Sequence, residues 1–517
     1  MTKKIFPLLL IICLIANAEP RKNHYLCLNN DVSAQKSKDI RLLVRGDDIG
    51  SFASANQACI DVCTKGIVRS LEVMVPCAWF SEAVQLLNEN PSIDVGVHLI
   101  NQTKVVRIHK NVSGAFELLV DGKPVFIKGA VGNNGIELVK KYGGNAIRSS
   151  FRKERLDEAH ALGLMALVNL PVVSQRDGFD YDDVEAVKVQ HERVMNIVRE
   201  TKNHPAVLMW ALGNELDHVP QQVYEPNKIY YNMKVWDAVN DLAKAIHEID
   251  PNHPVMTVVG SITQHKINAL NEQCPELDLL GVNEYGDLLK IPDWLREWGW
   301  KRPYQVTEWG PTGFWQTRRT PWGYHIEETG SEKADKYKER YEGTILADKG
   351  MCLGSYVFLW RQHQEYTHTW FGMFDSEWRE TEAVDVMRYL WTGEWPENRA
   401  PRVKSMTING KTARDFISLV PGEVADARVE MLDPDENDVI TYEWELLREP
   451  AYLGYGGNGE RKPESMDASF KMASDGTVSF TVPKEAGPYR LFVAGYDKGN
   501  HVATANIPVY VGEFTRP

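Results

Sequence analysis

The feature that most constrains the fold of this chain is an alternation of short apolar segments with helical stretches over residues 116–395. The helical stretches include residues 155–162, 184–201 and 234–249, which separate the apolar segments. The expected strands are residues 125–129, 145–148, 165–170, 207–212, 255–259, 279–283, 304–307 and 355–359. Strands that alternate with helices form parallel sheets, and eight such units are the number that closes a (β/α)₈ barrel.

Two further segments flank the predicted barrel. Residues 40–100 read as a βαβαβ fragment with parallel strands, in which the strand at residues 41–44 ends in the sequence GDDIG. After a proline-containing linker, residues 402–517 change to short alternating strands without a long helix, which is typical of an immunoglobulin-like β-sandwich. Its acidic turn, residues 433–438, is either a calcium site or a solvated turn. The chain is therefore expected to be an α/β protein with a fragment, a barrel and a sandwich in that order.

The overall composition excludes some classes of function. The chain has 517 residues, of which 43% are hydrophobic and 25% charged, as in an ordinary soluble globular protein. Its 58 basic and 71 acidic residues give a formal charge of −13, which disfavours a general nucleic-acid binder. The 15 Trp, 20 Tyr and 16 Phe fit either a large core or a site for flat ligands such as sugars.

The first 18 residues have the pattern of a secretory signal peptide. Lys3 and Lys4 form the positive region, an apolar stretch follows, and residues 16–18 (ANA) fit a cleavage site with small residues. A lipoprotein signal that ends at Cys13 is the alternative. No later stretch is long and apolar enough for a transmembrane helix. We therefore expect export to the periplasm or the extracellular space, and no membrane span in the mature chain.

Two carboxylates follow predicted strands of the barrel. Glu215 comes after the fourth strand and Glu308 after the seventh. The C-terminal ends of barrel strands share one face, where reactive groups are found. Retaining glycoside hydrolysis needs two such carboxylates: one protonates the leaving oxygen and later activates water, and the other attacks the anomeric carbon. Glu284 also follows a strand and is the alternative candidate.

The sequence around Glu215 resembles a known family. Residues 204–215 (HPAVLMWALGNE) are similar to the acid/base signature of glycoside hydrolase family 2. Weaker similarities to the same barrel lie at residues 121–129 (DGKPVFIKG), 144–148 (GNAIR) and 156–164 (LDEAHALGL). The family's usual modules before the barrel have no counterpart in this sequence, which leaves the identity of the sugar open.

The resemblance to family 2 implies roles for individual residues. It makes Glu215 the acid/base and Glu308 the nucleophile. It also implies that Asn214 contacts the sugar 2-hydroxyl, that Arg148 supports the nucleophile, and that Tyr285 lines the site near it.

Aromatic residues near the predicted strand ends are candidates for substrate contact. Trp360 ends the eighth strand and is either a sugar platform or a core residue; the platform is the expectation. Trp315 belongs to a long aromatic loop after the seventh strand, residues 314–325, which either contacts substrate or packs on its neighbours.

Residues 41–99 carry a second resemblance, to the start of a YdjC-like carbohydrate deacetylase. The matching segments are residues 46–50 (GDDIG), 65–70 (KGIVRS) and 94–99 (DVGVHL). The resemblance implies that Asp47 is a base and that Asp48 and His98 bind a divalent metal. The segment covers only the start of that domain and lacks a match for its second metal histidine. We interpret it as a fused remnant or as a chain joined from two neighbouring genes.

Taken together, the sequence predicts an exported retaining β-glycosidase that acts on an oligo- or polysaccharide. A transglycosylase would use the same two glutamates. The reaction requires no cofactor, and a divalent metal is expected only if the N-terminal fragment is an active deacetylase. The alternatives are a barrel that binds glycan without cleaving it, and a metal-dependent carbohydrate deacetylase.

Overall fold

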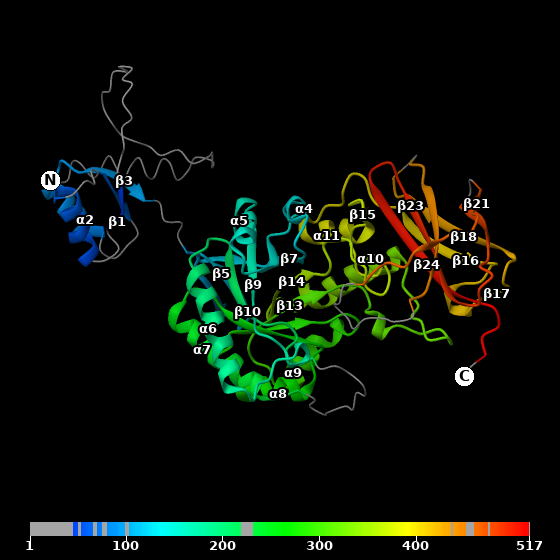
Figure 1. Ribbon diagram of the computed structural model, residues 1–517, viewed down its shortest axis with the longest axis horizontal. Helices are drawn as coiled ribbons and strands as arrows, with labels where there is room; N and C mark the ends of the chain where they lie inside the picture. Colours follow the sequence, from blue (N-terminus) through cyan, green and yellow to red (C-terminus); the bar gives the residue numbers. More distant parts are fainter. Residues whose placement is uncertain are drawn as a thin grey trace, which may run out of the picture. The chain divides into compact units, whose positions relative to one another are not determined.

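The computed structural model describes residues 45–49, 53–65, 70–74, 80–98, 103–218, 231–435, 438–450, 460–473 and 476–515 (Figure 1). The chain forms two compact units, Met1–Gln102 and Thr103–Pro517. The predicted signal peptide, residues 1–18, lies outside the described residues, so export stays a prediction.

The first unit contains a three-stranded parallel sheet in the order β1-β2-β3. Its elements are β1 (Arg45–Ile49), α2 (Ala53–Lys65), β2 (Ser70–Met74), α3 (Phe80–Glu89) and β3 (Asp94–His98). This is the predicted βαβαβ arrangement. The first strand differs from the prediction, because Asp47 and Asp48 lie within β1, while the expected strand at residues 41–44 falls outside the described residues.

A closed barrel of eight parallel strands forms the centre of the second unit, as predicted. The strands are β7 (Ile127–Val131), β8 (Ala146–Ser150), β9 (Met165–Leu170), β10 (Val207–Leu212), β11 (Val255–Gly260), β12 (Leu279–Asn283), β13 (Tyr304–Trp309) and β14 (Cys352–Val357). Every residue of β10, β11, β12 and β14 is buried, which explains why these strands are continuous apolar runs instead of alternating ones.

Helices lie outside the ring of strands (Figure 1). They are α4 (Ile136–Lys141), α5 (Lys153–Ala161), α6 (Val184–Thr201), α7 (Lys234–Ile249), α8 (Gln264–Gln273), α9 (Ile291–Glu297), α10 (Gly330–Arg340) and α11 (Glu382–Thr392). A π-helical turn, Tyr341–Leu346, extends α10. In α7 the apolar residues recur on one face and are buried against the barrel. Within the described part of the chain, no helix is both long enough and apolar enough to cross a bilayer.

A small antiparallel sheet closes the N-terminal end of the barrel. Its strands are β4 (Val106–Lys110), β5 (Phe116–Val120) and β6 (Lys123–Val125). Val106 and Leu118 are buried in one cluster with Ile127, Leu208 and Met256, which lie in the first two positions of their barrel strands. The sheet therefore fills the bottom of the barrel and leaves the opposite face, where the strands end, for a site.

The C-terminal part contains two sheets, consistent with the predicted β-sandwich. One sheet contains β15 (Glu380–Thr381), β17 (Ser418–Leu419), β19 (Thr441–Arg448), β20 (Ser465–Met466), β23 (Gly487–Tyr496) and β24 (His501–Val511). The other contains β16 (Arg402–Ile408), β18 (Val424–Leu432), β21 (Lys471–Met472) and β22 (Thr477–Thr481). Buried and exposed residues alternate along β18, as expected of a strand with one face in a core.

The barrel and the C-terminal sheets are joined by a strand pairing. β15 belongs to the segment that precedes the predicted boundary at residue 402, yet it pairs in parallel with β24. This pairing places Glu380 opposite His501. It adds β15, which comes from the barrel part of the chain, to the six-stranded C-terminal sheet.

Candidate active site

The turn after β10 positions Glu215 at the mouth of the barrel. Gly213 and Glu215 both have positive φ, 72° and 50°, and the Glu215 N–H donates to the carbonyl of Val258 at 2.8 Å. Positive φ at a residue other than glycine costs of order 1–3 kcal/mol and is concentrated at functional sites. Gly260, at the end of β11, approaches so closely that a Cβ there would lie 3.0 Å from Glu215 Cδ. The backbone therefore fixes where this carboxyl group lies.

Glu308 lies near the end of β13 and is held by two donors. Arg148 Nη1 donates to Glu308 Oε2 at 3.4 Å, and the Tyr285 hydroxyl donates to Oε1 at 2.7 Å. The Arg148 side chain is almost fully buried, while 17% of the Glu308 side chain is exposed. One oxygen thus faces a buried cation and the other a phenol, which together orient the carboxylate.

One hydrogen-bond network connects the two glutamates. Arg148 donates to Asn214 Oδ1 at 2.5 Å and to Asn283 Oδ1 at 3.3 Å. Asn283 Nδ2 donates to Asn214 Oδ1 at 3.0 Å and to Glu215 Oε1 at 2.9 Å. The structure therefore brings together five of the predicted site residues (Arg148, Asn214, Glu215, Tyr285 and Glu308), with Asn283 between the two carboxylates.

The electrostatics of the site reflect burial and the proximity of the two carboxylates. Burial and then the negative charge of Glu215 raise the pKa of Glu308 to about 7, while Arg148 and the hydrogen bond from Tyr285 lower it. Burial and the charge of Glu308 raise the pKa of Tyr285 well above its ordinary value, so its hydroxyl remains a donor. The negative charge of Glu215 thus disfavours ionisation of Glu308, so the two carboxyl groups are electrostatically linked.

Two exposed groups at the mouth are free to meet a ligand. Asn214 is exposed, and no described residue accepts a hydrogen bond from its Nδ2, since both contacts to its side chain use Oδ1. Trp315 is 46% exposed, and its ring stands edge-to-face on Tyr285 with the centroids 5.4 Å apart. An amide donor and an exposed indole are the kinds of group that hold a sugar.

Trp360 corrects one of the predictions. It was expected to be a sugar platform, but it is fully buried. Its ring stacks on Trp391 with centroids 5.5 Å apart, and its Nε1 donates to the carbonyl of Gly135 at 3.1 Å. Because β14 ends at Val357, Trp360 lies beyond the strand end and packs into the core.

The aromatic loop after β13 divides between the mouth and the C-terminal sheets. Trp315 lies beside Tyr285. In contrast, Trp322 packs against Tyr510 with centroids 5.8 Å apart, and the Tyr324 hydroxyl donates to the carbonyl of Pro450 at 2.9 Å. The expected substrate contact therefore concerns only the first part of this loop.

Glu284, the alternative catalytic candidate, has a different environment. It is 2% exposed, and its Oε1 accepts from the backbone N–H of Tyr285 at 2.9 Å. Burial raises its pKa. This carboxyl group closes the turn after β12, and no hydrogen bond or ion pair joins it to Glu215 or Glu308 among the described residues.

Several residues of the site were missed by the sequence analysis. One of them lies near the end of β9, where Asn169 Oδ1 accepts from Arg148 Nε at 3.2 Å. Thr307 donates to Asn283 Oδ1 at 2.9 Å, and His218 Nδ1 lies 3.3 Å from Glu215 Oε2. Asn169, Asn283 and Thr307 are polar residues at the C-terminal ends of apolar strands, and that pattern would have identified them.

A buried ion pair supports the turns that surround Glu215. Asp217 and Lys266, both about 95% buried or more, form this pair. Lys266 also donates to the carbonyls of Gly260 at 2.6 Å and Ser261 at 2.9 Å. These contacts connect the turn after β10 to the end of β11.

The predicted metal site of the N-terminal fragment has no described side chains. Asp47 and Asp48 lie in β1, His98 ends β3, and β2 separates the two strands. The side chains of all three fall outside the described residues. Their proposed roles as base and ligands therefore stay predictions.

Two family models match the chain. The model of the TIM barrel domain of glycosyl hydrolases family 2 matches residues 135–415. The model of the YdjC-like protein family matches residues 41–130, which extends past the expected end at residue 100 and over the sheet that closes the barrel. Both matches agree with the resemblances read from the sequence.

Individual proteins that are similar to this chain include β-glucuronidases and a carbohydrate deacetylase. A β-glucuronidase of Felis catus is 27% identical over 190 residues, which cover 33% of this chain and 26% of that protein. A carbohydrate deacetylase of Brevibacillus brevis is 32% identical over 90 residues, 17% of this chain and 34% of that protein. The crystal structure of a Bacteroides uniformis β-glucuronidase superposes with a TM-score of 0.44 and 15% identity, covering 80% of this chain and 48% of that one. The chain thus spans between about a quarter and a half of the length of these relatives.

Proposed function

Because the chain belongs to glycoside hydrolase family 2, we propose that it is a retaining β-glycosidase that cleaves an oligo- or polysaccharide through Glu215 and Glu308. The observation that carries this proposal is the hydrogen-bond network that joins both glutamates across the mouth of the barrel. It provides two carboxyl groups in different environments at one end of a closed barrel, which double displacement requires.

In the first step, the ionised Glu308 attacks the anomeric carbon while Glu215 gives its proton to the glycosidic oxygen. The bond between the anomeric carbon and that oxygen breaks, and a glycosyl ester forms on Glu308. Arg148 and Tyr285 contact one oxygen of Glu308 each, so they hold the attacking carboxylate in orientation.

In the second step, the ionised Glu215 removes a proton from a water molecule, which attacks the anomeric carbon and releases Glu308. Two inversions at the same carbon give net retention. Asn283 donates to Glu215 Oε1 and thus holds the acid/base in place.

Substrate contact is assigned to the two exposed groups of the mouth. Asn214 has its Nδ2 free among the described residues, and we assign this donor to the sugar 2-hydroxyl. Trp315 presents its indole beside Tyr285 and takes an apolar face of the sugar. The two carboxylates suffice for the reaction, so no cofactor is needed.

The relatives suggest where to begin the search for the substrate. Several of them are named β-glucuronidases, so an aryl β-glucuronide is the first substrate to try. Aryl β-galactosides, β-glucosides and acetylated glycans follow in the same panel.

The proposal is tested by turnover and stereochemistry. The purified chain is expected to release the aryl alcohol from one of these glycosides, and early NMR spectra are expected to show the β-anomer of the sugar first. Saturable glycan binding without turnover would favour a binding protein instead. Release of acetate that a chelator stops would favour the N-terminal deacetylase, and an α-anomer as first product would refute retention.

A further inference from the structure

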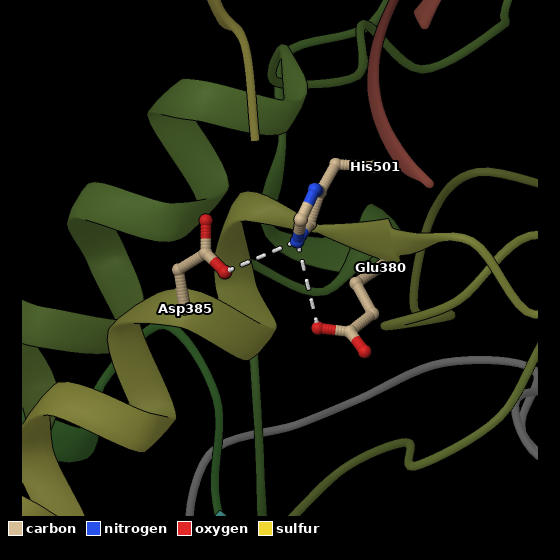
Figure 2. Close-up of side chains that lie close together, drawn as sticks. All are labelled: Glu380, Asp385 and His501. Carbon is tan, nitrogen blue, oxygen red and sulfur yellow. Dashed lines mark ion pairs between the residues drawn. The ribbon is translucent and has the colours of Figure 1, made fainter. Parts of the chain in front are cut away.

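A histidine and two carboxylates from separate elements meet where the barrel joins the C-terminal sheets (Figure 2). Glu380 belongs to β15, Asp385 to the first turns of α11, and His501 begins β24. His501 Nε2 lies 3.7 Å from Glu380 Oε2 and 4.0 Å from Asp385 Oδ1. The imidazole nitrogen points toward both carboxyl groups, and one ligand atom from each of the three residues lies within 4.8 Å of the others.

The opposite side of the imidazole is occupied by a further carboxylate. Asp497 Oδ2 lies 2.9 Å from His501 Nδ1, and Asp497 Oδ1 accepts from the backbone N–H of His501 at 2.8 Å. A carboxylate on Nδ1 keeps the proton there and leaves Nε2 with its lone pair. This is the arrangement in which histidine binds metals.

The two carboxylate ligands are also held from behind. Asp385 Oδ2 accepts from the backbone N–H of Ala400 at 2.7 Å, and the Tyr142 hydroxyl donates to Glu380 Oε1. In each residue one oxygen is thus occupied. The other oxygen, Asp385 Oδ1 or Glu380 Oε2, faces His501.

Protein cations balance the charge of this cluster only in part, since Arg399 acts on Asp385 from beyond ion-pair distance. Among the described residues, neither lysine nor arginine forms an ion pair with Glu380, Asp385 or Asp497, and His501 is their shared partner. Asp385 is 1% exposed, and its Oδ1 is buried without a hydrogen-bond partner. A buried carboxylate oxygen without a donor is costly, and a bound cation would remove that cost.

We propose that Glu380, Asp385 and His501 bind one divalent transition-metal ion of the zinc type, through two carboxylate oxygens and the imidazole Nε2. Tetrahedral ligands with bonds of about 2.0–2.2 Å to a metal lie roughly 3.3–3.6 Å apart, so the distances of 3.7 Å and 4.0 Å from Nε2 would have to shorten by a few tenths of an ångström on binding. A mixed nitrogen and oxygen set with one position left for water fits zinc better than calcium, which prefers more ligands and oxygen alone.

The role of the ion would be to fasten the last β-strand to the barrel. Two of the ligands come from residues 380–385 and the third from β24, so the ion ties together the elements whose pairing joins the barrel to the C-terminal sheets. The site is separate from Glu215 and Glu308, and the proposal does not depend on glycosidase activity.

Metal binding is measured on the full chain, purified without a histidine tag and stripped with a chelator. Titration with zinc is expected to show one equivalent bound, and cobalt in its place is expected to give visible d–d absorption. His501→Ala and Asp385→Asn should each abolish both signals. Asp497→Asn should weaken zinc binding by about 10–100-fold, the usual effect of losing a partner behind a metal histidine.

Two further variants keep the test decisive. Glu380→Gln changes a side chain that is 18% exposed, so folding should survive while binding is lost. His247→Ala is the matched control. His247 pairs with Asp278 at 2.9 Å, and neither residue belongs to the proposed metal site. This variant should therefore leave zinc binding unchanged.

Three results would overturn the proposal. The first is a folded chain that binds no zinc. The second is zinc binding that survives in Glu380→Gln and His501→Ala. The third is loss of binding in Asp433→Asn but not in Asp385→Asn, which would locate the ion in the neighbouring acidic group of Asp433, Asp438 and Asp497.

Discussion

The barrel mouth and the junction with the C-terminal sheets both bury carboxylates, but they compensate them differently. At the mouth, Glu308 has a buried arginine and a phenol as donors, and Glu215 has an amide. At the junction, Asp385 Oδ2 accepts from the backbone N–H of Ala400, but Oδ1 lies 4.0 Å from His501 and has no hydrogen-bond partner. Both carboxylates at the mouth therefore have hydrogen-bond donors, whereas the junction leaves one carboxylate oxygen without a donor.

The presence or absence of hydrogen-bond donors indicates a different role for the carboxylates of each region. Burial raises the pKa of Glu308 and of Asp385 to about 7 in both places. The fixed donors at the mouth orient a carboxylate that stays partly exposed and can react. The junction offers free ligand atoms that a cation can fill, which suits a structural role.

The largest expected effect is at the mouth. Glu308→Gln removes the nucleophile and should lower kcat by about 10⁴-fold or more, while Glu215→Gln should lower it by about 10²–10⁴-fold. Both are measured with the aryl glycoside that the panel identifies.

Glu284→Gln is the matched control for those two variants, because Glu284 is a buried glutamate that also follows a barrel strand. It should retain activity within a few-fold. A loss in Glu284→Gln as large as in Glu308→Gln would contradict the distinction between these carboxylates.

Trp360 should contribute to the stability of the fold and not to substrate binding. Trp360→Ala removes a fully buried ring from the core next to Tyr142 and should lower the free energy of unfolding by about 3–5 kcal/mol. Denaturant unfolding measures this. A change below about 0.5 kcal/mol, together with weaker substrate binding, would restore Trp360 as a sugar platform.

The pH dependence of stability should reveal the raised pKa of Glu308. A carboxyl group whose pKa rises from 4.5 to about 7 on folding stabilises the fold fully below pH 4.5, and this contribution is lost as pH rises to 7. Glu308→Gln has no carboxyl group to ionise and does not suffer this loss. The free energy of unfolding of Glu308→Gln minus that of the unchanged chain should therefore be up to about 3 kcal/mol larger at pH 8 than at pH 4. Thermal unfolding at the two pH values checks it, and an equal offset at both would argue against burial of the charge.

The junction should respond in the same way only when it is free of metal. Without zinc, Asp385→Asn should also gain stability relative to the unchanged chain as pH rises, because the pKa of Asp385 is raised from 3.8 to about 7. With zinc, the ionised carboxylate is a ligand and the unchanged chain should be the more stable one. If Asp385→Asn were the more stable protein both with and without zinc, the proposed difference between the mouth and the junction would be wrong.

The smallest effect is expected at the exposed indole. Trp315→Ala should raise KM by about threefold to tenfold, as expected for the loss of one aromatic contact of about 1 kcal/mol. Because the ring is 46% exposed, the free energy of unfolding should change by less than about 0.5 kcal/mol. An unchanged KM would remove Trp315 from the substrate site.

Much of the barrel could be predicted because its strands are continuous apolar runs. Strands 165–170, 207–212 and 279–283 were predicted with the bounds that the structure has. The eighth strand was predicted at residues 355–359, whereas β14 begins three residues earlier and ends at Val357. That shift also led to the wrong expectation for Trp360.

The candidate site was predicted less completely. Glu215 and Glu308 were found because each follows an apolar strand in a recognisable motif. Asn169 and Asn283 were missed, because a lone asparagine at a strand end has no local signal until the barrel closes and brings it to Arg148. The junction cluster could not be predicted, since Glu380 and His501 are far apart in the sequence and meet only through the pairing of β15 with β24.

The central claim is that Glu308 forms a covalent bond with the sugar in a site that it shares with Glu215. A mechanism-based fluorosugar of the preferred substrate traps this ester, and peptide mass spectrometry identifies the residue that carries the label. We expect one label per chain, on Glu308, and none in Glu308→Gln. A label on Glu284, or a single labelled residue elsewhere in the barrel, would contradict it.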